Sequence, residues 1–149
     1  MDRIVDTKEY LDQVLPLLAA GQDTVMLPVT GTSMAPFLHP GDTVFLTKPV
    51  HPFSPGDIVL YRRTDDTYIL HRIIRLGPDD IVWITGDNQT VLEPVQARNQ
   101  IVATVTAAKR KGRLVTTGSL LWVFYCSVWR WLRPIRPLLG KLYRITKAR

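Results

Sequence analysis

The chain has 149 residues, 46% hydrophobic and 21% charged, which suits one domain with a real core and excludes a wholly disordered chain. Its one cysteine, Cys126, excludes an internal disulfide and a cysteine-cluster zinc site. The chain contains no run of about 18 apolar residues, so the sequence predicts no membrane span. Residues 1–23 do not resemble a secretory signal peptide.

Charge is divided unevenly along the chain. Residues 1–93 contain all 13 acidic residues and seven Lys or Arg, whereas residues 94–149 contain 12 Lys or Arg and no acid. A basic segment of this size indicates contact with a polyanion, either an anionic membrane surface or a nucleic acid. A solvated tail is the alternative.

The first predicted element is a helix over residues 7–20, with Thr7 as its cap and Gly21 after its end. Pro16 weakens this prediction or kinks the helix. Five apolar or aromatic residues fall near one face: Tyr10, Leu11, Val14, Leu17 and Leu18.

Short strands separated by Gly, Pro and Asp turns follow from Thr24 to Val105. Pro28 places the first strand at a sheet edge or at a bulge. Since no helix separates the strands, we expect a mainly β fold, a compact antiparallel sandwich or barrel over residues 24–113. The six predicted strands are 24–30, 42–47, 57–62, 67–76, 80–85 and 100–106.

Residues 114–149 form an apolar and basic C-terminal tail. The uncharged run from Leu114 to Trp129 would span about 24 Å as a helix, which is less than the roughly 30 Å hydrocarbon core. Basic residues then alternate with apolar ones, and Pro134 and Pro137 divide the segment. We expect a basic amphipathic helical tail whose residues 119–149 lie at an anionic membrane surface. Packing of 119–132 on the β domain is the alternative, and nucleic-acid binding is less favoured because the aromatic residues cluster in an apolar run.

Two motifs could supply a nucleophile and a base. Residues 31–36 form a Gly-containing turn that would expose Ser33 on a rigid loop, beside backbone N–H groups that could stabilise an oxyanion. His71 shares a strand face with Ile69 and Ile73, where shielding from water favours the neutral imidazole of a general base. An ordinary turn and a core histidine are the alternatives.

A third motif, residues 85–89, ends a predicted strand and presents Asp87. Its carboxylate could orient an imidazole, and an ordinary Asx-turn is the alternative. Together the three motifs provide the nucleophile, base and carboxylate that nucleophilic acyl transfer requires.

The order of these motifs resembles the signal peptidase I superfamily, the serine peptidases of S24 and S26 type. The resemblance covers about residues 24–106 and is closer to the endoplasmic-reticulum and archaeal-type branch, in which histidine replaces the lysine base. The wider group includes the self-cleaving SOS-repressor fold. The matching segments are Gly-Thr-Ser-Met-Ala-Pro with Gly-Asp, then Gly-Asp-Ile-Val-Leu-Tyr, Ile-Leu-His-Arg-Ile-Ile and Gly-Asp-Asn.

This resemblance implies a mainly β serine endopeptidase that cleaves signal or leader peptides through an acyl-enzyme. Ser33 matches the nucleophile and His71 the general base, and the Ser33 amide would supply one oxyanion donor, the second being unassigned. The acidic residues of the family match Asp87 and a position near Glu93, where the family typically has aspartate. Both stay open as the orienting residue, with a small preference for Asp87. No metal or organic cofactor is implied.

The chain also departs from the family pattern, because signal peptidases usually carry an N-terminal anchor and residues 1–23 do not resemble one. If the tail docks on a bilayer, we expect a peripheral membrane-associated enzyme acting on precursor polypeptides. Otherwise a cytoplasmic enzyme would trim a soluble leader.

Two other classes of protein compete with the peptidase hypothesis. The first is a catalytically inactive peptide-binding or membrane-docking module on the same fold. The second is a self-cleaving regulator, which is disfavoured because residues 1–23 are too few for a helix-turn-helix. The small-residue stretch Leu18–Gly21 would be the segment to watch for self-cleavage.

Overall fold

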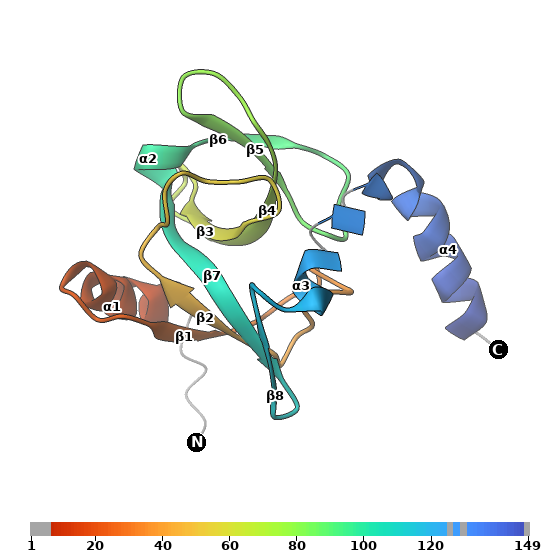
Figure 1. Ribbon diagram of the computed structural model, residues 1–149, viewed down its shortest axis with the longest axis horizontal. Coiled ribbons are helices and arrows are strands. Elements are labelled where there is room, and N and C mark those ends of the chain that lie inside the picture. Colours follow the sequence, from red (N-terminus) through yellow and green to blue (C-terminus); the bar gives the residue numbers. More distant parts are fainter. Residues whose placement is uncertain (1–6, 125–126, 129–130, 148–149) are drawn as a thin grey trace.

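Eight antiparallel strands form the body of the structure, a computed structural model that describes residues 7–124, 127–128 and 131–147 (Figure 1). The sheet order is β1-β2-β7-β3-β4-β5-β6, and β8 pairs with β7. The strands are β1 (Val25–Pro28), β2 (Thr43–Thr47), β3 (Ile58–Arg62), β4 (Tyr68–Leu76), β5 (Ile81–Thr85), β6 (Glu93–Gln96), β7 (Ile101–Arg110) and β8 (Arg113–Thr116). The mainly β antiparallel fold expected from the sequence is therefore confirmed.

All six predicted strands are present, and β6 and β8 are two that the pattern did not reveal. Pro94 lies inside β6, which pairs with β5 and lies at an edge of the sheet that the described residues form, where proline is tolerated. β8 forms a hairpin with β7 through Lys111 and Gly112, both of which have positive φ. β1 lies at the other end of the sheet, the edge position that Pro28 predicts.

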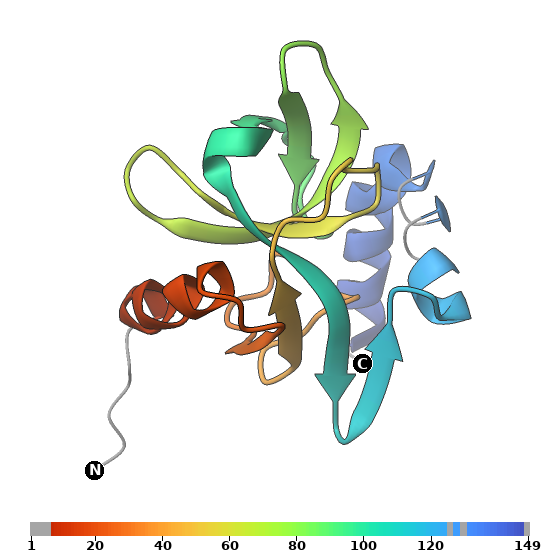
Figure 2. The ribbon, with the colours of Figure 1, turned by 60° about the vertical axis from the view of Figure 1, so that its left-hand side comes forward.

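β3 is the central strand and is buried on both faces. Ile58 and Leu60 belong to one hydrophobic cluster, and Val59 and Tyr61 belong to the other. β7 joins the two halves of the sheet, because its beginning pairs with β3 and its later part pairs with β2 and β8. Figure 2 shows the strong twist that this arrangement produces.

The N-terminal helix α1 (Thr7–Ala19) matches the predicted helix and includes Pro16. Leu11 and Leu18 are buried in the first of these clusters. The Tyr68 hydroxyl of β4 donates to Asp12 of α1 at 2.7 Å. The helix thus packs beside β1 (Figure 1) and is attached to β4 as well.

The predicted tail begins with residues 114–116 in β8, so its first residues belong to the sheet. The described residues that follow include the short helix α3 (Leu120–Phe124), the 3-10 helix η2 (Arg133–Ile135) and α4 (Arg136–Lys147). Another short helix, α2 (Ala97–Gln100), precedes β7. Pro134 lies in η2, and Pro137 lies in the first turn of α4, where a helix tolerates proline. None of the helices formed by the described residues is both long and apolar enough to cross a membrane.

For residues 119–132, packing of the tail on the β domain was the alternative, and in α3 the buried side chain is that of Trp122. This side chain is buried, and its ring meets the ring of Phe37 edge-on with centroids 5.0 Å apart. Leu120, Leu121 and Val123 are exposed. Other inferences from the sequence concern three residues that lie outside the described ranges: Cys126, Trp129 and Arg130.

Candidate active site

Ser33 lies on the loop between β1 and β2, in a turn closed by a hydrogen bond from Ala35 N to Thr32 O at 3.0 Å. Gly31 precedes the turn with φ +74°, a backbone conformation that favours glycine. Three side chains of the loop are buried in the hydrophobic cores: Met34, Phe37 and Leu38. These anchors give Ser33 the rigid loop that the sequence predicts.

An ion pair holds the far end of this loop. Arg110, at the end of β7, donates to Asp42 Oδ2 at 2.6 Å and to the carbonyl oxygen of Phe37 at 2.7 Å. Asp42 also accepts the backbone N–H of His39 at 2.9 Å. One arginine therefore fixes two points of the loop that presents Ser33.

The turn after β5 packs directly against the Ser33 loop. Asn88 N donates to the carbonyl oxygen of Ser33 at 2.8 Å. A Cβ added to Gly86 would lie 2.5 Å from that oxygen and 3.1 Å from His71 Nε2. Only a residue without a side chain allows Ser33, His71 and this turn to come so close.

His71 occupies the middle of β4, opposite Val59 of β3. Its side chain is 5% exposed, and Ile73 and Ile69 belong to or pack against the adjacent hydrophobic cluster, as the strand pattern predicts. Burial, together with the positive charge of Arg63, lowers the pKa of His71 to about 4. The imidazole is therefore neutral at physiological pH.

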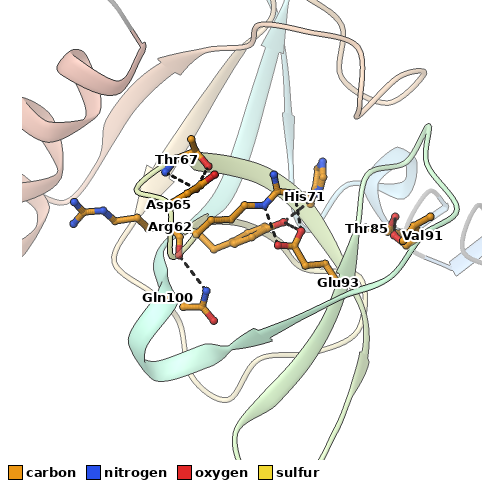
Figure 3. Close-up of polar contacts among 10 residues, drawn as sticks. Arg62, Asp65, Thr67, His71, Thr85, Val91, Glu93 and Gln100 are labelled. Carbon is orange, nitrogen blue, oxygen red and sulfur yellow. Dashed lines mark hydrogen bonds and ion pairs between the residues drawn. The ribbon is translucent and has the colours of Figure 1, made fainter.

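A polar chain leads from His71 to two charged residues. The Tyr61 hydroxyl donates to Glu93 Oε2 at 2.7 Å, and its oxygen lies 3.4 Å from His71 Nδ1. Arg63 donates to both carboxylate oxygens of Glu93, at 2.9 and 2.8 Å, which helps hold the pKa of Glu93 below its ordinary value. Figure 3 shows Glu93 and His71 approaching each other from different strands.

This chain determines the tautomer of His71. Because the Tyr61 proton is directed at Glu93, the Tyr61 oxygen is left as an acceptor for an N–H on His71 Nδ1. We therefore assign the proton to Nδ1. The lone pair of Nε2 then faces the side where Gly86 meets the Ser33 loop.

Asp87 faces a different partner. It forms two hydrogen bonds with Arg72, at 2.8 and 2.9 Å, and both side chains are fully buried. Arg72 also donates to the carbonyl oxygen of Gly56 and lies over the ring of Phe37. The sequence left both acids open as the orienting residue. Glu93 accepts the hydrogen bond of Tyr61, whose oxygen lies near His71, whereas Asp87 pairs with Arg72 and supports the turn after β5.

Sequence reasoning missed Tyr61, Arg63 and Arg72. An arginine in the apolar run of β4 was a usable signal, since a buried charge needs a partner. Tyr61 and Arg63 gave no such signal, because their contact with Glu93 depends on strand register. Figure 3 also shows Thr85 beside Val91, whose hydrogen bond closes the loop that leads to Glu93.

Ser33 and His71 line one pocket of about 270 Å³. Residues 27–30 of β1 and its following loop form one wall, and residues 68–70 of β4 form another. Among the described residues no hydrogen bond joins the side chains of Ser33 and His71. In many enzymes the hydrogen bond between nucleophile and base becomes short only when substrate binds. No group of three or more His, Cys, Asp or Glu in the described ranges is arranged to hold a metal ion.

Residues 2–107 match the family model described as Peptidase S24-like. The chain belongs to this family. The match supports the S24 and S26 superfamily indicated by the motifs and a peptidase-type fold for this S24-like domain. The family also includes non-catalytic members. No match was found among curated proteins or among solved structures.

The role of Asp87 in this S24-like domain can be tested through stability. We expect Asp87→Asn to lower the free energy of unfolding by about 3–5 kcal/mol, because it leaves the buried Arg72 charge without its carboxylate. Urea denaturation at pH 7 measures the change. The control is Asp66→Asn, which alters an exposed carboxylate beside Lys8 and Arg62 and should leave stability near that of the wild type. Equal losses in the two variants would contradict this role.

Burial of His71 also predicts a pH-dependent stability. The unfolded chain takes up a proton on His71 near pH 6.5, whereas the folded chain does so only near pH 4. Acidification through this window therefore favours unfolding, and stability present above pH 6.5 falls by about 3 kcal/mol on reaching pH 4. Urea denaturation across this range should show a steeper loss for the wild type than for His71→Gln. Parallel curves would show that His71 is not held neutral by the fold.

Proposed function

We propose that this S24-like domain is a serine endopeptidase in which Ser33 is the nucleophile and His71 the general base. The supporting observation is that a neutral His71 shares a pocket with Ser33, and its Nε2 faces the turn that binds the Ser33 carbonyl oxygen. A nucleophile close to a general base is what acyl transfer requires.

The proposed reaction begins when His71 Nε2 takes the Ser33 proton as the Ser33 oxygen attacks a peptide carbonyl. The Ser33 amide would donate to the oxyanion that develops. His71 then protonates the leaving amine, and water attacks the acyl-enzyme with His71 again acting as base. Tyr61 and Glu93 are positioning residues, because they orient Nδ1 and place a negative charge behind the imidazolium that forms.

The proposed substrates are signal or leader peptides bound in an extended conformation. β1 is an edge strand, and residues 27–30 of it and its loop line the pocket, so a peptide could add its backbone hydrogen bonds there. The choice of signal or leader peptides rests on the motif resemblance, which also leads us to expect small side chains next to the cleaved bond.

A second candidate is a peptide-binding module that does not cleave. It is favoured by the absence, within the described residues, of a hydrogen bond between Ser33 and His71. Such a module would bind peptides in the same pocket without turnover.

Cleavage of precursor-derived peptides distinguishes the two candidates. We expect Ser33→Ala and His71→Ala each to lower kcat/KM by at least about a thousandfold, because each removes one half of the proton-transfer pair. A mixture of signal and leader peptides analysed by mass spectrometry measures this. Ser54→Ala and His51→Ala, both exposed on a loop outside the pocket, serve as matched controls. Unchanged cleavage by Ser33→Ala would remove Ser33 from the mechanism.

The positioning role of Tyr61 predicts a separation of kinetic constants. Tyr61→Phe should lower kcat about 10- to 100-fold with little change in KM, because His71 loses the acceptor that fixes its tautomer. Tyr10→Phe, which removes a hydroxyl bonded to Met26 O away from His71, is the control.

The pH profile tests the charge behind the histidine. Glu93 raises the pKa of His71, so Glu93→Gln should move the acidic limb of kcat/KM below that of the wild type. The contrary result is an activity loss in Tyr61→Phe and Glu93→Gln that is proportional to their loss of folded protein, with the acidic limb of kcat/KM at the wild-type pH. That result would assign both residues a structural role only.

A further inference from the structure

The helix α4 exposes an apolar stripe. Leu138, Leu142 and Ile145 are 61%, 53% and 64% exposed. Their spacing of four and three residues places all three on one face of the helix. Figure 1 shows α4 lying apart from the β sheet.

The charge around this stripe has a single sign. Lys141 lies within one helical turn of both Leu138 and Ile145, and Arg144 adjoins Lys141 by one turn. Both basic residues are exposed. Since residues 94–149 contain 12 Lys or Arg and no acid, the surface offered by the tail is basic as well as apolar.

Exposed apolar side chains also precede α4 in the chain. Trp131 is 83% exposed and Ile135 is also exposed. In α3, Leu120 and Leu121 are exposed while Trp122 is buried against Phe37. Exposed apolar residues that recur through successive helices, rather than singly, mark an interaction surface.

We infer that α3 and α4 dock on an anionic lipid bilayer, with α4 lying in the plane of the interface. A helix of 12 residues is about 18 Å long, which suits lying in the interface and is too short for the roughly 30 Å hydrocarbon core. Leu138, Leu142 and Ile145 would enter the acyl region, and Lys141 and Arg144 would reach the phosphates. A nucleic acid would satisfy the charges but leave the apolar stripe in water.

This inference does not depend on the proposed peptidase activity. Trp122 connects the tail to Phe37, a buried residue of the loop that carries Ser33. A docked tail would therefore hold the pocket near the membrane surface, whatever reaction the pocket performs.

Flotation of the 149-residue chain with lipid vesicles tests the inference. We expect binding to vesicles of phosphatidylcholine with 30% phosphatidylglycerol, weakening as salt rises, and at least tenfold weaker binding to pure phosphatidylcholine. The double variant Leu138→Ser with Leu142→Ser should lower binding to the anionic vesicles at least tenfold. The double variant Lys141→Gln with Arg144→Gln should lower it severalfold and reduce its salt dependence.

A matched control removes equally exposed apolar side chains elsewhere. Val50→Ser with Leu76→Ser changes residues that are 54% and 51% exposed and lie outside the tail, and it should bind as the wild type does. Circular dichroism and urea denaturation confirm that every variant is folded. Equal losses in the control and the leucine variant would overturn the inference, as would equal binding to neutral vesicles. Binding of a duplex DNA or RNA probe without vesicle binding would also overturn it.

Discussion

The buried ion pair between Arg72 and Asp87 is the contact on which the candidate site depends. Arg72 precedes Ile73 and follows His71 on β4, and Asp87 follows Gly86 in the turn that meets Ser33. Two charges without solvent exposure are costly to bury, so their stabilisation requires the paired hydrogen bonds that they make. The pair therefore fixes where the turn lies against β4, and with it the distance between His71 and the Ser33 loop.

His71 and Arg72 are consecutive residues of β4, and their side chains contact different groups because side chains alternate between the two faces of a strand. Arg72 reaches Asp87, the Gly56 carbonyl and the Phe37 ring, whereas His71 reaches toward Tyr61 and the pocket. Burial and Arg63 lower the pKa of His71, and Glu93 and Asp87 oppose them. In the proposed mechanism, the ion pair of Arg63 with Glu93 balances charge beside His71, which is neutral at rest and would accept a proton during the reaction.

Sequence patterns predicted local structure well and long-range contacts poorly. The Gly, Pro and Asp turn signals located six of the eight strands in the described residues, and the Gly-Thr-Ser-Met-Ala-Pro run located a turn. β6 escaped notice because Pro94 is unusual inside a strand, although an edge permits it. The connection from His71 through Tyr61 to Glu93 joins three strands, and its existence depends on registers that no local pattern specifies. The preference for Asp87 over Glu93 as the orienting acid rested on the position of Asp87 in its motif. Motif position does not reveal that Arg72 is the hydrogen-bonding partner of Asp87.

Phe37 is where the tail and the site meet. Its ring receives Trp122 edge-on at 5.0 Å, and the Arg72 guanidinium lies 5.0 Å from the centroid of the same ring. A continuous set of contacts therefore runs from α3 through Phe37 and Arg72 to Asp87. Phe37 of the Ser33 loop thus packs against both a side chain of the tail and the arginine that pairs with Asp87, so truncating its ring would remove packing from both sides at once.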